Sequence, residues 1–149
     1  MPDGEDFGAT PDEMLLGSKA FAQHWEQVMK PVKGFARFEY GILLDMVGDR
    51  DLAIYQENFS AEAAPDVVNK VWSAAAELGY RNVFIPEKKY SIEDDHQPLL
   101  AAGIRCIDVI DFDYAPWHTL DDTPDKCSPE SLKVVGDVIT KVVYSESGG

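Results

Sequence analysis

One stretch of the chain decides its fold class: Tyr40-Gly41-Ile42-Leu43-Leu44-Asp45-Met46-Val47. It is apolar on both faces except at Asp45, and a short apolar run that ends at turn residues is typical of a buried strand. Turn residues occupy 48–51, and Leu52–Tyr55 predicts a second, shorter strand. The sequence therefore predicts a buried sheet that carries one acidic side chain.

Upstream of this stretch the sequence predicts a helix over about residues 11–28. Thr10 is a suitable N-cap, Pro11 suits the first helical position, and Glu13 completes a capping box. An apolar-leaning stripe at helical spacing predicts the inward face, which would consist of Leu15, Ser18, Phe21, Ala22, Trp25 and Val28.

Downstream, helical and strand patterns alternate. Strands are predicted over 82–86 and 104–110, and helices over 65–78, from Asp94 or Asp95 to Gly103, and from Pro129 to about Tyr144, where Ser128 is the cap. This alternation predicts an α/β fold, a three-layer sandwich with a mixed, mainly parallel sheet and helices on both faces. The residues predicted to face inward are Val68, Val71, Trp72, Ala75 and Leu78, then Leu132, Val135, Val138, Ile139 and Val142.

Length and composition limit the class of protein. The chain has 149 residues, which predicts a single domain over 1–149 with a frayed tail at 143–149. The net charge is −14, from 13 Lys+Arg against 27 Asp+Glu, so neither nucleic acid nor an anionic membrane is an expected partner. The two cysteines, Cys106 and Cys127, show no disulfide or zinc-finger spacing. No membrane-spanning run or signal peptide is visible, and the compartment is not readable.

Four acidic or histidine-containing clusters lie at strand ends or in loops: Asp3-Gly4-Glu5-Asp6, Asp45, Glu93-Asp94-Asp95-His96, and Pro116-Trp117-His118-Thr119-Leu120-Asp121-Asp122-Thr123. Each also has an ordinary structural explanation. The first would be a turn before a helix, the second a buried acid satisfied by backbone N–H groups or an Arg, the third an N-cap, and the fourth a solvent loop.

The chemistry of these clusters favours a metal site. His24 lies in a helix and is expected to be an ordinary surface residue, and the chain has no Ser nucleophile elbow, P-loop or GxGxxG motif. Carboxylates with one imidazole are compatible with zinc. Hydrolysis by metal-activated water is therefore the expected class of catalysis.

The order of these clusters along the chain resembles that of a known protein family. The segments are Asp3-Gly4-Glu5-Asp6-Phe7-Gly8, Leu43-Leu44-Asp45-Met46-Val47-Gly48, Glu93-Asp94-Asp95-His96, and Trp117-His118-Thr119 followed by Asp121-Asp122-Thr123-Pro124-Asp125. Together they resemble the C-terminal part of the zinc-dependent aminopeptidases of peptidase family M28, which also includes the glutaminyl-peptide cyclotransferases. The resemblance runs from residue 3 to about Tyr144.

The resemblance implies roles for these residues. Glu5 would be the general base and Asp94 an acid that supports proton transfer. Asp6 and His118 would bind zinc, and Asp45 would bind a second zinc in two-zinc peptidases or join a hydrogen-bond network in one-zinc cyclases. The remaining implied roles are an aromatic pocket wall, Trp117, and carboxylates that support the metal site, Asp95 and Asp121. The implied substrates are peptide N-termini.

The resemblance also implies that part of the family fold precedes these residues. The family has further strands, a His-x-Asp ligand motif and another metal-binding Asp before the Asp-Gly-Glu motif. We therefore expect weak or no zinc binding by these residues alone, no efficient catalysis, and self-association through an exposed sheet edge. The alternatives are a glutaminyl-cyclase-like acyltransferase, favoured by Trp117 and Asp94, and a non-enzymatic remnant or interaction module.

Overall fold

The computed structural model describes residues 10, 13–30 and 38–146. Four strands run through it: β1 (Gly41–Asp45), β2 (Ile54–Gln56), β3 (Phe84–Lys88) and β4 (Cys106–Ile110). The helices are α1 (Leu16–Met29), α2 (Asn58–Ala63), α3 (Pro65–Glu77), α4 (His96–Ala101) and α5 (Pro129–Ser145), with a 3₁₀ turn, η2 (Pro124–Lys126). None of these helices is long and apolar enough to cross a membrane.

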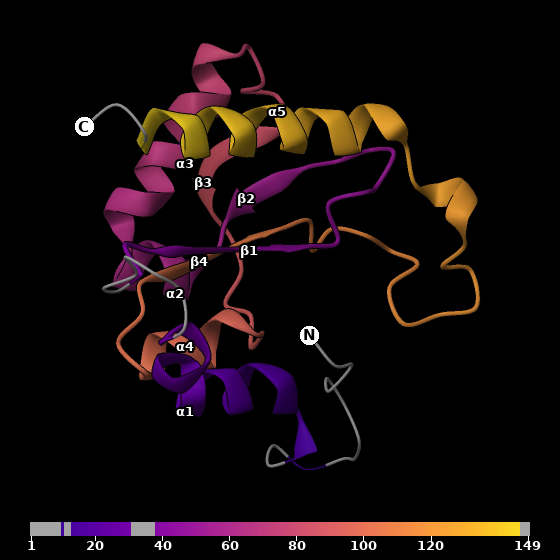
Figure 1. Ribbon diagram of the computed structural model, residues 1–149. Coiled ribbons are helices and arrows are strands. Elements are labelled where there is room, and N and C mark those ends of the chain that lie inside the picture. Colours follow the sequence, from indigo (N-terminus) through magenta and orange to yellow (C-terminus); the bar gives the residue numbers. More distant parts are fainter. Residues whose placement is uncertain (1–9, 11–12, 31–37, 147–149) are drawn as a thin grey trace.

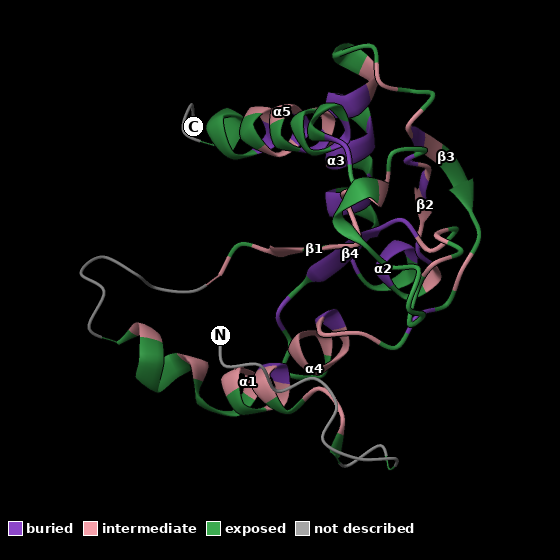
Figure 2. Cartoon of the chain, turned by 90° about the vertical axis from the view of Figure 1, so that its right-hand side faces the viewer, coloured by how far each residue is buried: buried purple, intermediate pink, exposed green. Residues whose placement is uncertain are grey.

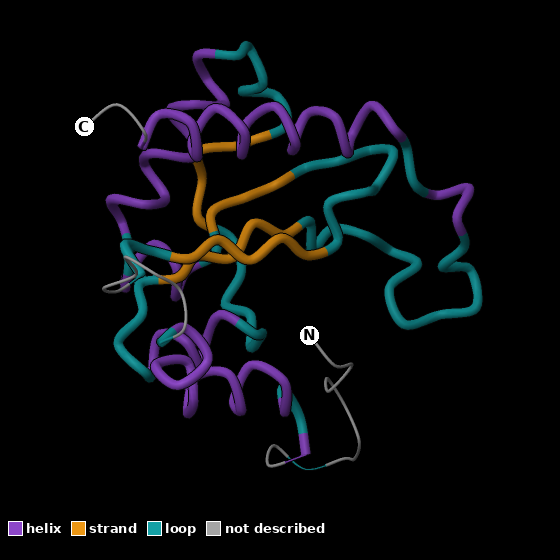
Figure 3. The backbone as a smooth tube through the Cα atoms, in the orientation of Figure 1, coloured by secondary structure: helices purple, strands orange, loops and turns teal. Residues whose placement is uncertain are grey.

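The strands form two parallel pairs. β1 pairs with β4 in a register that runs from Gly41 opposite Cys106 to Asp45 opposite Ile110, and β2 pairs with β3. β2 also packs close to β4, so the four strands lie side by side (Figure 3). Since parallel strands end at the same edge, Asp45 lies beside the end of β4.

Helices cover the strands on both sides. Figure 1 shows α3 and α5 on one side of the strands and α1, α2 and α4 on the other, which confirms the predicted α/β layered fold. The buried residues concentrate on β4 and on the facing sides of α3 and α5 (Figure 2). The core includes fully buried side chains from strands and helices, among them Ile54, Val71, Ile107 and Val138.

Several local signals act as predicted. The Ser128 side chain accepts the N–H of Ser131 and so caps α5, whose first residue is Pro129. α3 begins at Pro65, and Gly79 follows its end with φ of 85°, a conformation that glycine adopts without strain. These signals are local, which explains why they could be read from the sequence.

Other expectations need correction. The first helix begins at Leu16 instead of about residue 11, because Leu15 adopts a left-handed conformation (φ 55°) and the Thr10 hydroxyl bonds to Glu13 in a separate turn. β1 is only partly buried, and β4 is the strand whose residues are all buried. The helix α2 was not predicted. Its six residues are too short for a helical stripe to stand out.

Three residues that were predicted to face inward are exposed: Val28, Leu78 and Leu132. Each lies near a helix end, where the chain turns away from the core. Leu78 is the C-cap of α3, Val28 lies in the last turn of α1, and Leu132 in the first turn of α5. A periodic pattern gives the direction of a side chain, but not whether a neighbour covers it.

Candidate functional site

Two acidic segments meet at the end of the β1–β4 pair. Asp45 closes β1 and is half-buried, and its Oδ1 accepts the N–H of Met46 at 2.9 Å. Met46 itself has φ of 51°, an uncommon conformation for a residue with a side chain. Asp94 and Asp95 precede α4, which packs against β1, and Asp95 shares an apolar hollow with Ile42 and Leu43. The fold therefore brings together three of the predicted acids.

Burial and nearby negative charge favour the protonated form of two of these acids, Asp94 and Asp45. Burial raises the pKa of the Asp94 carboxyl to about 6, and the charges of Asp45 and Asp95 act in the same direction. Burial also raises the pKa of Asp45, which the N–H of Met46 partly opposes. Asp94 Oδ1 accepts the N–H of Asp95 at 2.6 Å, while its Oδ2 is buried with no hydrogen-bond partner in the described part of the chain. Asp94 can thus hold or release a proton near neutral pH.

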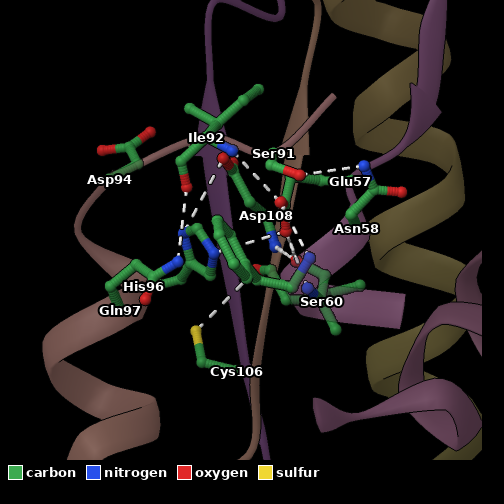
Figure 4. A network of polar contacts seen from close by, with 12 residues as sticks. Glu57, Asn58, Ser60, Ser91, Ile92, Asp94, His96, Gln97, Cys106 and Asp108 are labelled. Atoms are coloured by element: carbon green, nitrogen blue, oxygen red, sulfur yellow. Dashed lines mark hydrogen bonds and ion pairs between the residues drawn. The ribbon is translucent and has the colours of Figure 1, made fainter. Parts of the chain in front are cut away.

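Behind these acids lies a fully buried group of polar side chains, Glu57, His96 and Asp108 (Figure 4). His96 Nε2 lies 3.4 Å from Glu57 Oε2, and its Nδ1 lies 3.8 Å from Asp108 Oδ2. Burial raises the pKa of Asp108 to about 9, and the charges of Asp94 and Asp45 act in the same direction.

The Glu57 carboxyl behaves in the opposite way. Burial by itself would raise its pKa, but the contact with His96 and the hydrogen bonds from Ser60 and Phe59 outweigh burial and lower the pKa to about 2. The ion pairs recorded among the described residues leave Asp45, Asp94 and Asp108 without a Lys or Arg partner. The site is therefore strongly acidic and compensated mainly by protons and N–H groups.

The predicted imidazole lies on a separate loop after β4. His118 is exposed, has φ of 57°, and stacks on Trp117 with ring centroids 4.2 Å apart. Trp117 in turn packs on Phe112 at 5.1 Å, and Phe112 on Tyr90 at 5.3 Å. This row of aromatic rings holds the His118 loop from one side and leaves the imidazole open to solvent. A non-glycine residue with positive φ is more frequent at functional sites than elsewhere.

The predicted site residues thus fall into three groups. Asp45, Asp94 and Asp95 lie close together, Trp117 and His118 are stacked on each other, and Asp121 lies further along the same exposed loop, where its N–H donates to the Thr119 hydroxyl. Glu5 and Asp6 lie outside the described residues. Within the described residues no three His, Cys, Asp or Glu side chains form a ready-made metal cluster.

Glu57, Ser60 and Asp108 were not predicted as site residues from the sequence. Asp108 had a visible signal, since it interrupts the apolar strand pattern of 104–110. Glu57 and Ser60 had none, because an acid between Gln56 and Asn58 and a single serine three residues later look like an ordinary surface segment. Their burial follows from the packing of α2 against β4, which is a tertiary contact.

Comparisons with known proteins agree with this architecture. The family model described as Peptidase family M28 matches residues 2–143. Aminopeptidase YwaD of Bacillus subtilis is 29% identical over 143 residues, which are 87% of this chain and 29% of that protein. The glutaminyl-peptide cyclotransferase of Boiga irregularis is 22% identical, over 87% of this chain and 39% of that protein.

Solved structures show the same relationship. The crystal structure of Tannerella forsythia glutaminyl cyclase has 38% identity and a TM-score of 0.81, over 95% of this chain and 52% of that one. A Zn-dependent exopeptidase from Parabacteroides distasonis has 36% identity and a TM-score of 0.80, over 92% and 48%. The chain therefore spans about half the length of these solved chains and less than half of the curated relatives.

Proposed function

This chain belongs to peptidase family M28, and on that premise we propose that it carries part of the active site of a zinc-dependent aminopeptidase-like hydrolase that acts on peptide N-termini. The observation that supports this most is the juxtaposition of two half-buried carboxyl groups, Asp45 at the end of β1 and Asp94 in the turn before α4. Relatives of both kinds act on peptides, as an aminopeptidase and as glutaminyl-peptide cyclotransferases.

The donors of this chain fit zinc in type. Asp45, Asp6 and His118 would hold it, because carboxylate oxygens and one imidazole nitrogen suit this ion. The unpartnered Asp94 Oδ2 and the acids without a Lys or Arg partner are what a site prepared for a cation would show. When bound, zinc would polarise a carbonyl and lower the pKa of a bound water towards about 7.

The remaining residues would divide the chemistry. Glu5 would accept and return the proton, and Asp94 would support this transfer, since its pKa of about 6 lies close to the working pH. Asp95 and Asp121 would orient their neighbours through hydrogen bonds. Trp117 would form an aromatic wall beside His118 and offer the substrate side chain an apolar surface.

A glutaminyl-cyclase-like acyltransferase is the second candidate. It is favoured by the Trp117–His118 stack together with a protonatable Asp94, a combination that suits the expulsion of ammonia from a bound γ-amide. In that reaction the substrate amine would attack its own γ-carbonyl, and Glu5 would move the proton from the amine to the departing ammonia. A non-enzymatic interaction module remains the third candidate.

We further propose that the 149 residues by themselves bind zinc weakly and turn over substrate slowly, because they span about half the length of the related solved chains and a metal site needs all of its ligands in place. With 27 acidic and 13 basic residues, neither nucleic acid nor an anionic membrane is proposed as a partner.

One experiment separates the candidates. Zinc content and turnover are measured for the 149-residue chain with an aminoacyl anilide and with an N-terminal glutamine peptide. Glu5→Gln and the exposed control Glu62→Gln are measured in parallel. Slow turnover that Glu5→Gln abolishes supports an enzyme, and the substrate that is consumed identifies the reaction. Turnover that survives Glu5→Gln would exclude Glu5 as the base. No zinc uptake and no turnover would favour the interaction module.

A further inference from the structure

Glu57 occupies an unusual place for a helix cap. It is the N-cap of α2, is 2% exposed, and both of its oxygens are fully used. Oε2 accepts the N–H and the hydroxyl of Ser60, both at 2.7 Å. Oε1 accepts the N–H of Phe59 at 2.9 Å and that of Ile92 at 3.2 Å. A cap needs only the contacts within α2. The bond to Ile92, which lies 35 residues further along the chain, is not part of the α2 cap.

The contacts of Glu57 enclose the acidic turn of the proposed site. Ile92 lies two residues before Asp94, and His96, whose Nε2 is 3.4 Å from Glu57 Oε2, lies two residues after it. Figure 4 shows these two contacts converging on one carboxylate from both ends of the segment. Glu57 therefore holds the segment from residue 92 to residue 96 at both of its ends.

The contact between His96 and Glu57 favours one tautomer of the imidazole. The ionised Glu57 carboxylate can only accept, so the 3.4 Å separation from Oε2 favours a ring that carries its proton on Nε2. Nδ1 then faces Asp108 Oδ2 at 3.8 Å, which is beyond hydrogen-bond distance, so the ring lies between two carboxyl groups and its closer contact is with Glu57. A carboxylate that fixes the tautomer of a histidine in this way also fixes the position of the chain that carries it.

We infer that Glu57 is a positioning residue of the proposed active site: by binding the Ile92 N–H and the Nε2 proton of His96, it holds the Asp94–Asp95 turn beside Asp45. The geometric part of this inference stands by itself. Its kinetic consequence rests on the proposed function, because it requires that Asp94 take part in the reaction.

The first test uses the unmodified chain. In ¹⁵N-labelled protein, ring correlations of His96 are assigned by their loss in His96→Asn, which is practical because the chain has three histidines. The expected result near neutral pH is an Nε2 that carries a proton, with slow exchange against water because the ring is buried. An Nε2 without a proton would overturn the inference, and this result does not depend on any activity.

The second test removes the charge. In Glu57→Gln, amide hydrogen exchange at Ile92 and Asp95 is expected to rise at least about tenfold over the exposed control Glu62→Gln, because opening of the turn becomes easier. kcat is expected to fall about 10- to 100-fold with a KM that stays within about twofold, as for other residues that orient a catalytic group. Unchanged exchange at Ile92 would overturn the inference.

A shorter side chain covers the case in which the Gln variant does not fold. Glu57→Asp keeps the charge and the cap of α2, but the carboxylate no longer reaches Ile92. Faster exchange at Ile92 with an intact helix α2 supports the inference, and wild-type exchange there contradicts it. If the wild-type chain shows no turnover, the proposed function fails while the His96 ring and the exchange rates still decide the role of Glu57.

Discussion

The hydroxyl of Ser60 accepts the N–H of Asp108 at 2.9 Å and donates its own proton to Glu57 Oε2 at 2.7 Å. Ser60 lies on α2 and Asp108 in the middle of β4, 48 residues apart. One hydroxyl thus connects a short helix to the most buried strand and satisfies a donor and an acceptor at once. The buried polar group behind the proposed site is therefore tied to the core of the fold.

Replacement of Ser60 by Ala should destabilise the protein. It leaves the Asp108 N–H buried without an acceptor and removes a donor from Glu57, so a loss of about 1–3 kcal/mol in the free energy of unfolding is expected. Urea denaturation measures it. Ser73→Ala, on the exposed side of α3, is the matched control and should change little. Equal effects of the two substitutions would contradict the role of the Ser60 hydroxyl.

The high pKa of Asp108 predicts a stability that depends on pH. Its carboxyl has a pKa of about 9 in the folded protein, against about 3.9 in an unfolded chain. A proton that binds more tightly in the folded state stabilises the fold below the unfolded pKa, and this contribution is lost as the pH rises towards the folded pKa. The free energy of unfolding should therefore fall between pH 5 and pH 8.

Asp108→Asn tests this assignment. Asn has nearly the same shape as Asp but cannot ionise. The decrease in the free energy of unfolding between pH 5 and pH 8 should therefore become smaller by roughly 1–4 kcal/mol, and the part that remains would come from Asp94. Glu57 does not contribute in this window, because its pKa is lowered to about 2. Urea denaturation in the presence of EDTA measures the difference, with the exposed Asp51→Asn as control. A pH dependence that remains unchanged in Asp108→Asn would contradict the prediction.

Much of the fold could be read from the sequence, and the supporting part of the site could not. Pro129 after Ser128 and the apolar stretch around Asp45 are local signals, and the elements they predicted are present. The contacts of Glu57 join three segments that only packing brings together, and nothing near Glu57 in the sequence marks it as buried. The acid Asp45 could be found because a charge in an apolar run is conspicuous.

Asp94 should control the rate of the proposed reaction. Asp94→Asn removes a carboxyl group that can exchange a proton near pH 6, so kcat should fall about 10²-fold or more. The inflection near pH 6 in the profile of kcat against pH should disappear with it. Asp66→Asn, an exposed acid on α3, should leave both unchanged. A pH profile that keeps its inflection in Asp94→Asn would assign that inflection to another group.

Trp117 should act on substrate binding more than on the chemical step. Its indole stacks on His118 and packs on Phe112, so Trp117→Ala removes an aromatic wall while leaving the acids in place. An increase in KM of about tenfold is expected, from about 1.4 kcal/mol of lost contact. Leu120→Ala in the same loop is a suitable control because Leu120 is fully exposed. A loss confined to kcat would place Trp117 outside the substrate pocket.

Self-association is expected through the edge of β1. On one side β1 is hydrogen-bonded to β4, and within the described residues no second strand pairs with β1 on its other side. An open strand edge tends to pair with another chain, and Leu44 on this strand is 43% exposed. Light scattering should therefore show a mass that rises with protein concentration.

Leu44→Lys should reduce this rise, since an edge charge opposes pairing between strands, whereas Leu120→Lys on the loop after β4 should not. A constant monomer mass at high concentration would contradict the prediction, and equal effects of the two lysines would mean that net charge, and not the β1 edge, governs association.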